Sequence, residues 1–250
     1  MMANSSHDAR INIHVIMCGD TSSGKTCLIN KYTKNIYNDE NTDTSNAVDF
    51  TIYNTNVLNT NSPHELLHNC KLHVFDLSGD KIFENIIKPY INMSDICILC
   101  FDTKNIKQSI KYVTDWINTT VHYKKNIYIL GTKYDVCNTE IDNIHEMGIM
   151  ISEYSRIWYS YKNIQFIGVC SSKYDKFHPW TINFTLDKMG IIDNTKQYNI
   201  NDMFNLMLLH YIKKCVPVDI LHIKNNDVNY ENIDTDNMED TNHCSLFCCF

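Results

Sequence analysis

The sequence predicts an α/β fold, built on a mostly parallel six-stranded sheet with one antiparallel edge strand and helices on both faces. Short, nearly continuous apolar runs alternate along the chain with segments of helical periodicity. Apolar runs of this length are typical of strands that are buried on both faces. Four of them are present: Ile13–Met17, Ile96–Phe101, Ile127–Leu130 and Ile164–Val169.

Helical periodicity is clearest in two segments, where apolar residues recur every three or four positions and so share one face of a helix. A third helix is expected from Lys25 to Tyr32, after the first apolar run. The repeating apolar residues are Ile106, Ile110, Val113, Ile117 and Val121 in one segment, and Phe204, Met207, Leu208 and Tyr211 in the other.

The antiparallel edge strand is predicted from an alternating pattern. Val48, Phe50 and Ile52 alternate with more polar residues, which indicates a half-buried strand. A connection through residues 61–63 would allow this strand to pair with Leu72–Asp76.

The length of 250 residues and the hydrophobic content of 44% suit one domain with tails. We expect a flexible N-terminus over residues 1–10, a single domain over 11–215 and a flexible acidic tail over 216–250. Residues 174–197 lack a clear period and are expected to form an inserted surface segment.

Composition excludes several classes of protein. The net charge of −7 disfavours a nucleic-acid binder that relies on a basic face. The N-terminus lacks both an apolar signal region and the glycine needed for myristoylation, and no apolar run is long enough to span a bilayer. We therefore expect a cytosolic chain with mostly reduced cysteines. Cys97 and Cys100 point to opposite faces of a strand, so they are expected in the core, and no histidine shows metal-ligand spacing.

The clearest motif is a glycine-rich loop between the first apolar run and the first helix. It fits the pattern G-x-x-x-x-G-K-[ST], in which backbone N–H groups and a helix N-terminus point at phosphate oxygens. The lysine of such a loop reaches the β- and γ-phosphates, and its hydroxyl residue binds Mg²⁺. The loop predicts a P-loop NTPase fold and consists of Gly19, Asp20, Thr21, Ser22, Ser23, Gly24, Lys25 and Thr26, followed by Cys27.

Polar residues follow three further strands, at the carboxyl ends where ligands bind in such sheets. Asp76 ends one strand and is suited to hold Mg²⁺ through water, while the Gly79 N–H is suited to meet a γ-phosphate. Residues 131–135 and 170–173 follow the next two strands.

With these motifs in this order, the chain resembles a small GTPase of the Ras superfamily, and in particular the Rab branch, over roughly residues 10–215. The resemblance implies GTP and GDP as ligands with Mg²⁺. Thr132, Lys133 and Asp135 match the family's [NT]-K-x-D motif, so Asp135 would accept hydrogen bonds from guanine N1 and N2 while Lys133 covers the base. Ser171, Ser172 and Lys173 resemble the S-A-K motif, which contacts guanine O6.

Smaller similarities point to the Rab branch. Ala47–Phe50 resembles the end of the Rab segment I-G-V-D-F, and Lys71–Asp76 resembles K-L-Q-I-W-D with Phe75 in place of tryptophan. Tyr90–Ser94 occupies the place of Y-Y-R-G-A.

The resemblance also implies a first switch segment. Counting forward from Lys25 places Tyr37 where the family stacks an aromatic ring on guanine, and Thr44 where its Mg²⁺-binding threonine lies. Counting back from residues 48–50 selects Ser45 instead. We prefer Thr44, so that the metal ligands would be Thr26, Thr44 and Asp76.

The implied catalytic residues are Lys25, Thr44 and Asp80, and Asp80 departs from the family. The usual residue there is a glutamine that orients the attacking water. Aspartate is shorter and would turn a negative charge toward the γ-phosphate, and Thr21 crowds the same space, so we expect slow GTP hydrolysis. The alternative is a GTP-locked interaction module that recruits trafficking effectors. A P-loop nucleoside or nucleotide kinase would need an arginine-rich lid, and the only arginines are Arg10 and Arg156.

The chain finishes with adjacent cysteines, Cys248 and Cys249, before Phe250. Residue 247 is Phe, so the C-a-a-X pattern fails, but the pair resembles Rab tails that carry two geranylgeranyl groups. Two lipids would anchor the chain to the cytosolic face of a membrane, with a cytosolic pool. Its partners would be effectors, exchange factors and activating factors; the alternative is an apolar tail that binds a partner.

Overall fold

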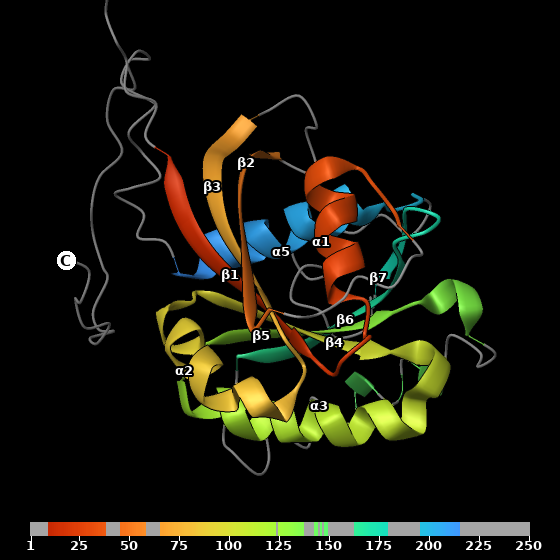
Figure 1. Ribbon diagram of the computed structural model, residues 1–250. Coiled ribbons are helices and arrows are strands. Elements are labelled where there is room, and N and C mark those ends of the chain that lie inside the picture. Colours follow the sequence, from red (N-terminus) through yellow and green to blue (C-terminus); the bar gives the residue numbers. More distant parts are fainter. Residues whose placement is uncertain are drawn as a thin grey trace, which may run out of the picture. The chain divides into compact units, whose positions relative to one another are not determined.

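The computed structural model describes residues 10–38, 46–58, 66–123, 125–137, 143–144, 146, 148–149, 163–179 and 196–215. Within them, seven strands form one sheet with helices on both faces (Figure 1). The strands are β1 (Ile11–Gly19), β2 (Val48–Leu58), β3 (Leu66–Leu77), β4 (Ile96–Asp102), β5 (Asn126–Thr132), β6 (Ile164–Ser171) and β7 (Lys176–Pro179). The helices are α1 (Lys25–Lys34), α2 (Glu84–Met93), α3 (Ile106–Thr120) and α5 (Ile200–Cys215), and short 3₁₀ turns cover Lys81–Phe83, Thr103–Asn105, Val121–Tyr123 and Tyr134–Val136.

The order of the strands across the sheet is β2-β3-β1-β4-β5-β6-β7. The five inner strands run parallel, while β2 pairs with β3 and β7 pairs with β6 in the antiparallel sense. The predicted fold class is therefore confirmed. The predicted number of six strands is wrong, because β7 adds a second antiparallel edge.

The four apolar runs all form inner parallel strands, as predicted. Their side chains are buried on both faces of the sheet because helices cover both faces; in β4, for example, Ile96 to Phe101 are all buried. Cys97 and Cys100 both lie in this strand and are free, buried thiols. The expected helices are present as α1, α3 and α5.

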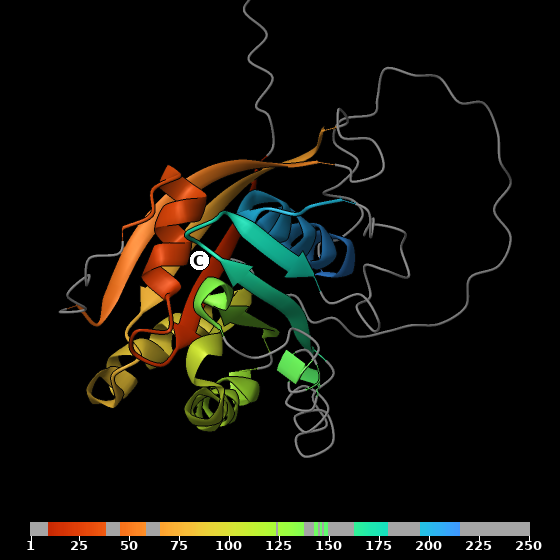
Figure 2. The ribbon, with the colours of Figure 1, turned by 90° about the vertical axis from the view of Figure 1, so that its right-hand side faces the viewer.

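Helices α1 and α5 lie on one face of the sheet, and α2 and α3 lie on the other (Figures 1 and 2). On the first face the ring of Tyr32 from α1 stacks on Phe204 from α5, with 3.7 Å between the ring centroids. On the second face, Ile87 and Ile91 of α2 and Val113 of α3 belong to one buried apolar cluster. This core fixes the carboxyl ends of the parallel strands relative to one another.

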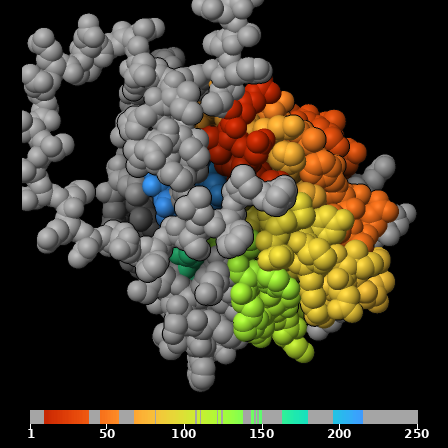
Figure 3. Space-filling model, turned by 90° about the vertical axis from the view of Figure 1, so that its left-hand side faces the viewer, coloured from red at the N-terminus to blue at the C-terminus, as the bar shows by residue number. Residues whose placement is uncertain are grey.

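The edge strand β2 pairs with β3 as predicted, but its residues Phe50 and Ile52 face the solvent. Phe50 and Ile52 are 50% and 49% exposed, whereas Val57 is buried and Tyr53 contacts Tyr32 of α1. The strand is therefore half-buried as predicted, but the covered face is the one opposite Phe50 and Ile52. At the edge of the sheet, β2 lies apart from β1 and β4, which α2 and α3 contact on the face of Phe50 and Ile52. In Figure 3 the red-to-yellow atoms of β1, β2, β3 and α2 form one continuous outer face.

The segment expected as a surface insertion, residues 174–197, is structured at both of its described ends. Residues 176–179 form β7, and Phe177 is buried while its N–H donates to the carbonyl of Tyr198 at 2.9 Å. A strand this short has a single buried apolar residue, so it shows no period in the sequence. Residues 180–195 lie outside the described residues.

Several other predictions also fall outside the described part of the chain. These are the flexible termini at 1–9 and 216–250, the Mg²⁺ ligand Thr44 with its alternative Ser45, and the lipidation sites Cys248 and Cys249. None of the described helices combines the length and the apolar character that a membrane span requires.

Candidate nucleotide-binding site

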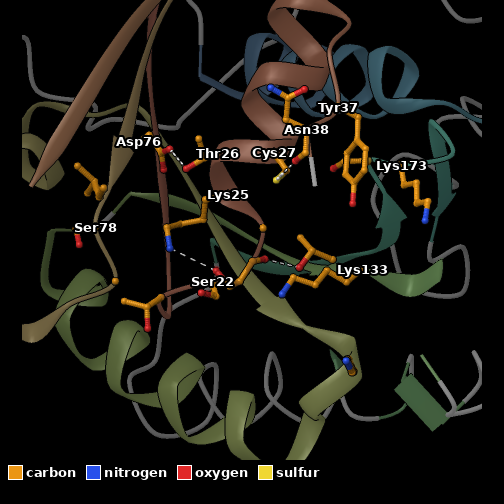
Figure 4. A pocket seen from close by; sticks show the side chains of 18 of the residues that line it. Ser22, Lys25, Thr26, Cys27, Tyr37, Asn38, Asp76, Ser78, Lys133 and Lys173 are labelled. Carbon is orange, nitrogen blue, oxygen red and sulfur yellow. Dashed lines mark hydrogen bonds between the residues drawn. The ribbon is translucent and has the colours of Figure 1, made fainter. Parts of the chain in front are cut away.

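A cavity of about 350 Å³ opens at the carboxyl ends of the parallel strands (Figure 4). Loops that follow β1, β3, β5 and β6 line it, because parallel strands deliver their carboxyl ends to the same edge of the sheet. The predicted site residues that line this cavity are Thr21, Ser22, Ser23, Gly24, Lys25, Thr26, Cys27, Tyr37, Asp76, Gly79, Thr132, Lys133, Asp135, Ser172 and Lys173.

The loop between β1 and α1 requires its glycines. Gly19 has φ +138°, and a Cβ there would lie 2.2 Å from the carbonyl oxygen of Cys100. Gly24 has φ +84° and caps the N-terminus of α1, where its carbonyl accepts the N–H of Leu28 at 3.0 Å. Ser22 is also left-handed, with φ +59°. The chain therefore turns tightly and presents the N-terminus of α1 to the cavity, an arrangement that favours anions.

Lys25 extends back across this loop. Its Nζ donates to the carbonyls of Asp20 at 2.6 Å and Gly19 at 3.0 Å. The side chain is buried, and burial lowers the pKa of its ammonium, an effect that the neighbouring Asp76 carboxylate opposes. A buried cation at a helix N-terminus is suited to bind a phosphate group.

Thr26 and Asp76 form the oxygen-rich end of the cavity. The Thr26 hydroxyl donates to Asp76 Oδ2 at 2.5 Å. Burial raises the pKa of Asp76, and the hydrogen bond from Thr26 opposes that rise. Hydroxyl and carboxylate oxygens suit Mg²⁺. Among the described residues, no three His, Cys, Asp or Glu side chains form a group that could hold a metal ion by themselves, so the ion would need further oxygens from a bound phosphate.

The opposite end of the cavity is formed by the loops after β5 and β6. Ser171 Oγ donates to Asp135 Oδ1 at 2.7 Å, which orients this carboxylate. Lys133 is left-handed, with φ +58°, and its Nζ forms an ion pair with Asp102 Oδ2 at 2.9 Å. In Figure 4, Tyr37, Lys133 and Lys173 lie at this end, away from Asp76 and Thr26.

Thr132 joins the two ends. Its hydroxyl lies 2.5 Å from the carbonyl oxygen of Ser23 in the phosphate loop and 2.9 Å from that of Phe101 in β4. Thr132 and Ser23 are both buried. The loop after β5 is therefore bonded directly to the loop after β1, although 109 residues separate them.

Asp80 is placed differently from the other predicted residues, because it does not line this cavity. Its side chain accepts a hydrogen bond from the N–H of Ile82 at 3.0 Å, and its own N–H donates to Ser78 Oγ at 3.2 Å. The carboxylate thus caps the turn that leads into α2. Gly79 packs so closely on the phosphate loop that a Cβ there would lie 2.2 Å from Thr21 N.

Of the remaining predicted residues, Gly19 and Asp20 support Lys25 through their carbonyls, and Ser171 supports Asp135 through its hydroxyl. Sequence reasoning missed seven lining residues. The missed residues that lie next to a motif could have been found by extending that motif. Asn46 and Lys104 lie in no recognisable motif, so the sequence around them does not indicate that they line the cavity. The missed residues are Asn38, Asn46, Asp49, Leu77, Ser78, Lys104 and Val136.

Comparison with known proteins gives one family match and several relatives. The family model described as Roc, "Ras of Complex, Roc, domain of DAPkinase", matches residues 14–135. The Ras-related protein Rab-24 of Dictyostelium discoideum is 26% identical over 132 residues, which are 51% of this chain and 58% of the relative.

Two further relatives give the same picture. The Ras-related protein Rab-19 of Xenopus laevis is 26% identical over 125 residues, 49% of this chain and 54% of the relative. The human Ras-related protein Rab-36 is 25% identical over 150 residues, 56% of this chain and 52% of the relative. The chain thus spans about half the length of the curated relatives that it matches.

The matched family region runs from β1 to Asp135, so it contains the phosphate loop, Asp76 and the loop after β5. The glycine-dependent loop and most of the residues that line the cavity lie on this stretch, while β6, β7, Ser172 and Lys173 lie beyond it. Together, the fold and these similarities support a Rab-like small GTPase of the Ras superfamily.

Proposed function

We propose that this protein is a GTP/GDP-binding switch that acts in membrane or vesicle trafficking. The observation that carries the proposal is that one cavity joins a phosphate-type end, with Lys25 and Thr26, to Asp135 at the other end. Guanine presents two neighbouring donors, N1–H and N2–H, to a carboxylate, and adenine offers no such pair. An acceptor that Ser171 holds in place therefore favours guanine.

The lining residues have different roles in binding the phosphates, the metal ion and the base. Lys25 and the backbone N–H groups of the loop bind the β- and γ-phosphates. Thr26 and Asp76 hold Mg²⁺, together with Thr44 from the first switch segment, and the ion offsets charge on the phosphates. Tyr37 and Lys133 flank the base, while Ser171, Ser172 and Lys173 form the loop around its O6 edge.

Slow hydrolysis is part of the proposal. Asp80 is engaged with the backbone of Ile82 and lies outside the cavity, so it is not positioned to orient water. A move toward the γ-phosphate would bring two negative charges together, which costs free energy. If Asp80 prevents hydrolysis altogether, the same observation favours a GTP-locked module that recruits trafficking effectors. A measurement of the rate of GTP hydrolysis separates the two possibilities.

The switch would operate through Gly79. This residue lines the cavity and lies against Thr21 of the phosphate loop, so a γ-phosphate that binds the Gly79 N–H would reposition the segment that leads into α2. Ile82 and Ile86 of that segment and Phe50 of β2 are exposed apolar residues, which suit contact with effectors and regulators.

The membrane association rests on the sequence alone. We propose geranylgeranylation of Cys248 and Cys249, since one lipid chain binds a membrane only marginally and the acidic tail offers no basic second signal. Mass spectrometry of protein isolated from eukaryotic cells should find two added isoprenoid groups. Unmodified cysteines in such a sample would remove the lipid anchor from the proposal.

The proposal as a whole is tested by identifying the nucleotide that purifies with the native full chain. We expect GDP or GTP at about one equivalent per chain after denaturation and chromatography. A single-turnover assay with GTP and Mg²⁺ then separates a slow switch from a locked module. Recovery of an adenine nucleotide, or failure to bind added GDP, would refute the guanine assignment.

A further inference from the structure

A second cavity, of about 280 Å³, lies between α2 and α3 on the face of the sheet opposite α1 and α5. We call it the α2–α3 pocket. It is separate from the nucleotide cavity, and the two share only Gly79. Its lining residues are Gly79, Asp80, Glu84, Ile87, Tyr112, Asp115, Trp116, Asn118 and Thr119.

Two aromatic rings form one wall of this pocket. Tyr112, Trp116 and Thr119 follow one another at spacings of four and three along α3, so they occupy one face of that helix. Trp116 also packs on the buried cluster of this face, which restrains its ring. An indole or phenol face that is held in place attracts cations through its quadrupole.

Acidic residues line both sides of the pocket. Asp80 and Glu84 belong to the segment that begins α2, and Asp115 belongs to α3. None of the described residues that line the pocket is Lys, Arg or His. Glu84 lies 3.3 Å from Lys88 one helical turn away, but both side chains are about half exposed, and an exposed pair of this kind is weak.

We propose that the α2–α3 pocket binds the guanidinium group of an arginine side chain from a partner protein. A planar cation can stack on Trp116 or Tyr112 while its N–H groups donate to the carboxylates of Asp80, Glu84 and Asp115. Lysine suits the pocket less well, because its ammonium neither stacks nor donates in a fork.

The surroundings of the pocket favour a protein partner over a free amine. Ile82 and Ile86 lie within two residues of Glu84 and are 74% and 53% exposed, so a partner that inserts one side chain would also cover apolar surface. The chain is acidic and has two arginines among its 250 residues. A partner protein with an exposed arginine would therefore be complementary in charge to the pocket.

The pocket is also placed to sense the nucleotide. Asp80 lines the pocket, and its neighbour Gly79 lines both cavities and contacts the phosphate loop. An inserted guanidinium would offset the charge of Asp80, so its affinity should differ between the GDP- and GTP-bound forms. Only this dependence on nucleotide rests on the proposed function; binding of the cation does not.

The direct test uses agmatine, whose aliphatic stem carries a guanidinium at one end and an ammonium at the other. Its matched control is N-carbamoylputrescine, in which a neutral urea replaces the guanidinium and the ammonium is kept. Agmatine added to ¹⁵N-labelled full chain at low ionic strength should shift the indole N–H of Trp116 and the amides of residues 80–84 saturably. Asp115→Asn and Glu84→Gln should each weaken binding about threefold. Glu146→Gln removes an exposed acid outside the pocket and should leave the affinity unchanged.

Equal shifts with N-carbamoylputrescine, or non-saturating shifts spread over all acidic surfaces, would overturn the proposal that the pocket binds a guanidinium. A second arm compares agmatine with the capped peptide Leu-Arg-Leu. Contact with Ile82 and Ile86 should make the peptide bind at least about fivefold tighter, and Ile86→Ser should remove that gain. Equal affinities would overturn the assignment to a protein partner. If the chain failed to bind GDP yet still bound agmatine, the proposed function would be refuted, while the proposal that the α2–α3 pocket binds a guanidinium would be supported.

Discussion

The two sides of the nucleotide cavity are built differently. On the side of the phosphate and base loops, four polar side chains are buried and hydrogen-bonded, namely Ser23, Lys25, Thr132 and Ser171. On the side of the switch segment and β2, large apolar side chains face the solvent, and Asp80 forms hydrogen bonds with Ser78 and Ile82 of its own turn.

This difference separates two properties of the protein. In the proposed function, recognition of a nucleotide would depend on groups that the core and one another hold in place, so it should tolerate little change. The proposed hydrolysis and partner binding would depend on exposed segments, which are the segments that ligands and partners can rearrange. Changes on the two sides should therefore give effects of different size and kind.

The largest effect is expected from Asp135→Asn on the base side. Loss of two hydrogen bonds to a charged acceptor should weaken GDP binding by about a hundred- to a thousandfold. Because an amide can donate where the carboxylate accepted, xanthosine diphosphate should gain affinity. Competition titrations with labelled GDP measure both changes, and Glu146→Gln serves as the control. An unchanged guanine preference would show that the base does not bind at Asp135.

On the switch side, Asp80→Gln should raise the single-turnover rate of GTP hydrolysis about tenfold, equal to about 1.4 kcal/mol of activation free energy, with GDP affinity unchanged. Asp80→Asn is the matched control, since it removes the charge but keeps the length. If Asn accelerates as much as Gln, charge is the cause. If neither accelerates hydrolysis, the aspartate is not what slows it.

Thr132→Ala tests the link between the base and phosphate loops. Removal of the hydroxyl leaves the buried carbonyls of Ser23 and Phe101 short of a donor, so the free energy of unfolding should fall by about 1–2 kcal/mol. GDP should also dissociate faster. Urea denaturation and stopped-flow release measure the two effects, and Thr132→Ser, which keeps the donor, should restore most of both. Normal stability without the hydroxyl would argue against this link.

The stability of the protein is expected to depend on pH through His210 of α5. The hydroxyl oxygen of Tyr128 in β5 lies 2.6 Å from Nδ1 of this histidine. Burial, with a smaller effect from Lys214, lowers the pKa of His210 to about 4. The unfolded chain binds a proton near pH 6.5 and the folded chain only near 4, so stability falls as the pH drops between them. The unfolding free energy should decrease by about 1 kcal/mol between pH 7.5 and 5.5. The difference between the wild type and His210→Gln across this range should show that slope; a constant difference would contradict it.

The smallest effect is expected from Phe50→Ser on β2. The ring is half exposed and contacts Phe75 at 4.9 Å between centroids, so its loss should cost less than about 0.5 kcal/mol of stability. GDP affinity should not change. Urea denaturation and GDP titration measure both quantities. A loss as large as that of Thr132→Ala would mean that the two sides are not built differently.

Much of this architecture could be predicted from local patterns. Ile96–Phe101 is apolar throughout because helices cover both of its faces, and the helix from Lys25 begins where a glycine motif ends. By contrast, the sequence around Phe177 offers one apolar residue, too few to reveal β7. The alternation of Phe50 with polar residues predicted a strand, but a period of two cannot say which face is covered.

The sequence by itself determined the α/β class and the phosphate-loop motif, and it predicted the residues suited to phosphate and guanine, because periodicity and spacing reside in neighbouring residues. Only the tertiary structure decided that Thr132 is bonded to Ser23, that Asp80 lines the α2–α3 pocket instead of the nucleotide cavity, and that Phe50 and Ile52 of β2 face the solvent. These features depend on which distant segments meet, and that is set by the packing of the whole sheet and its helices.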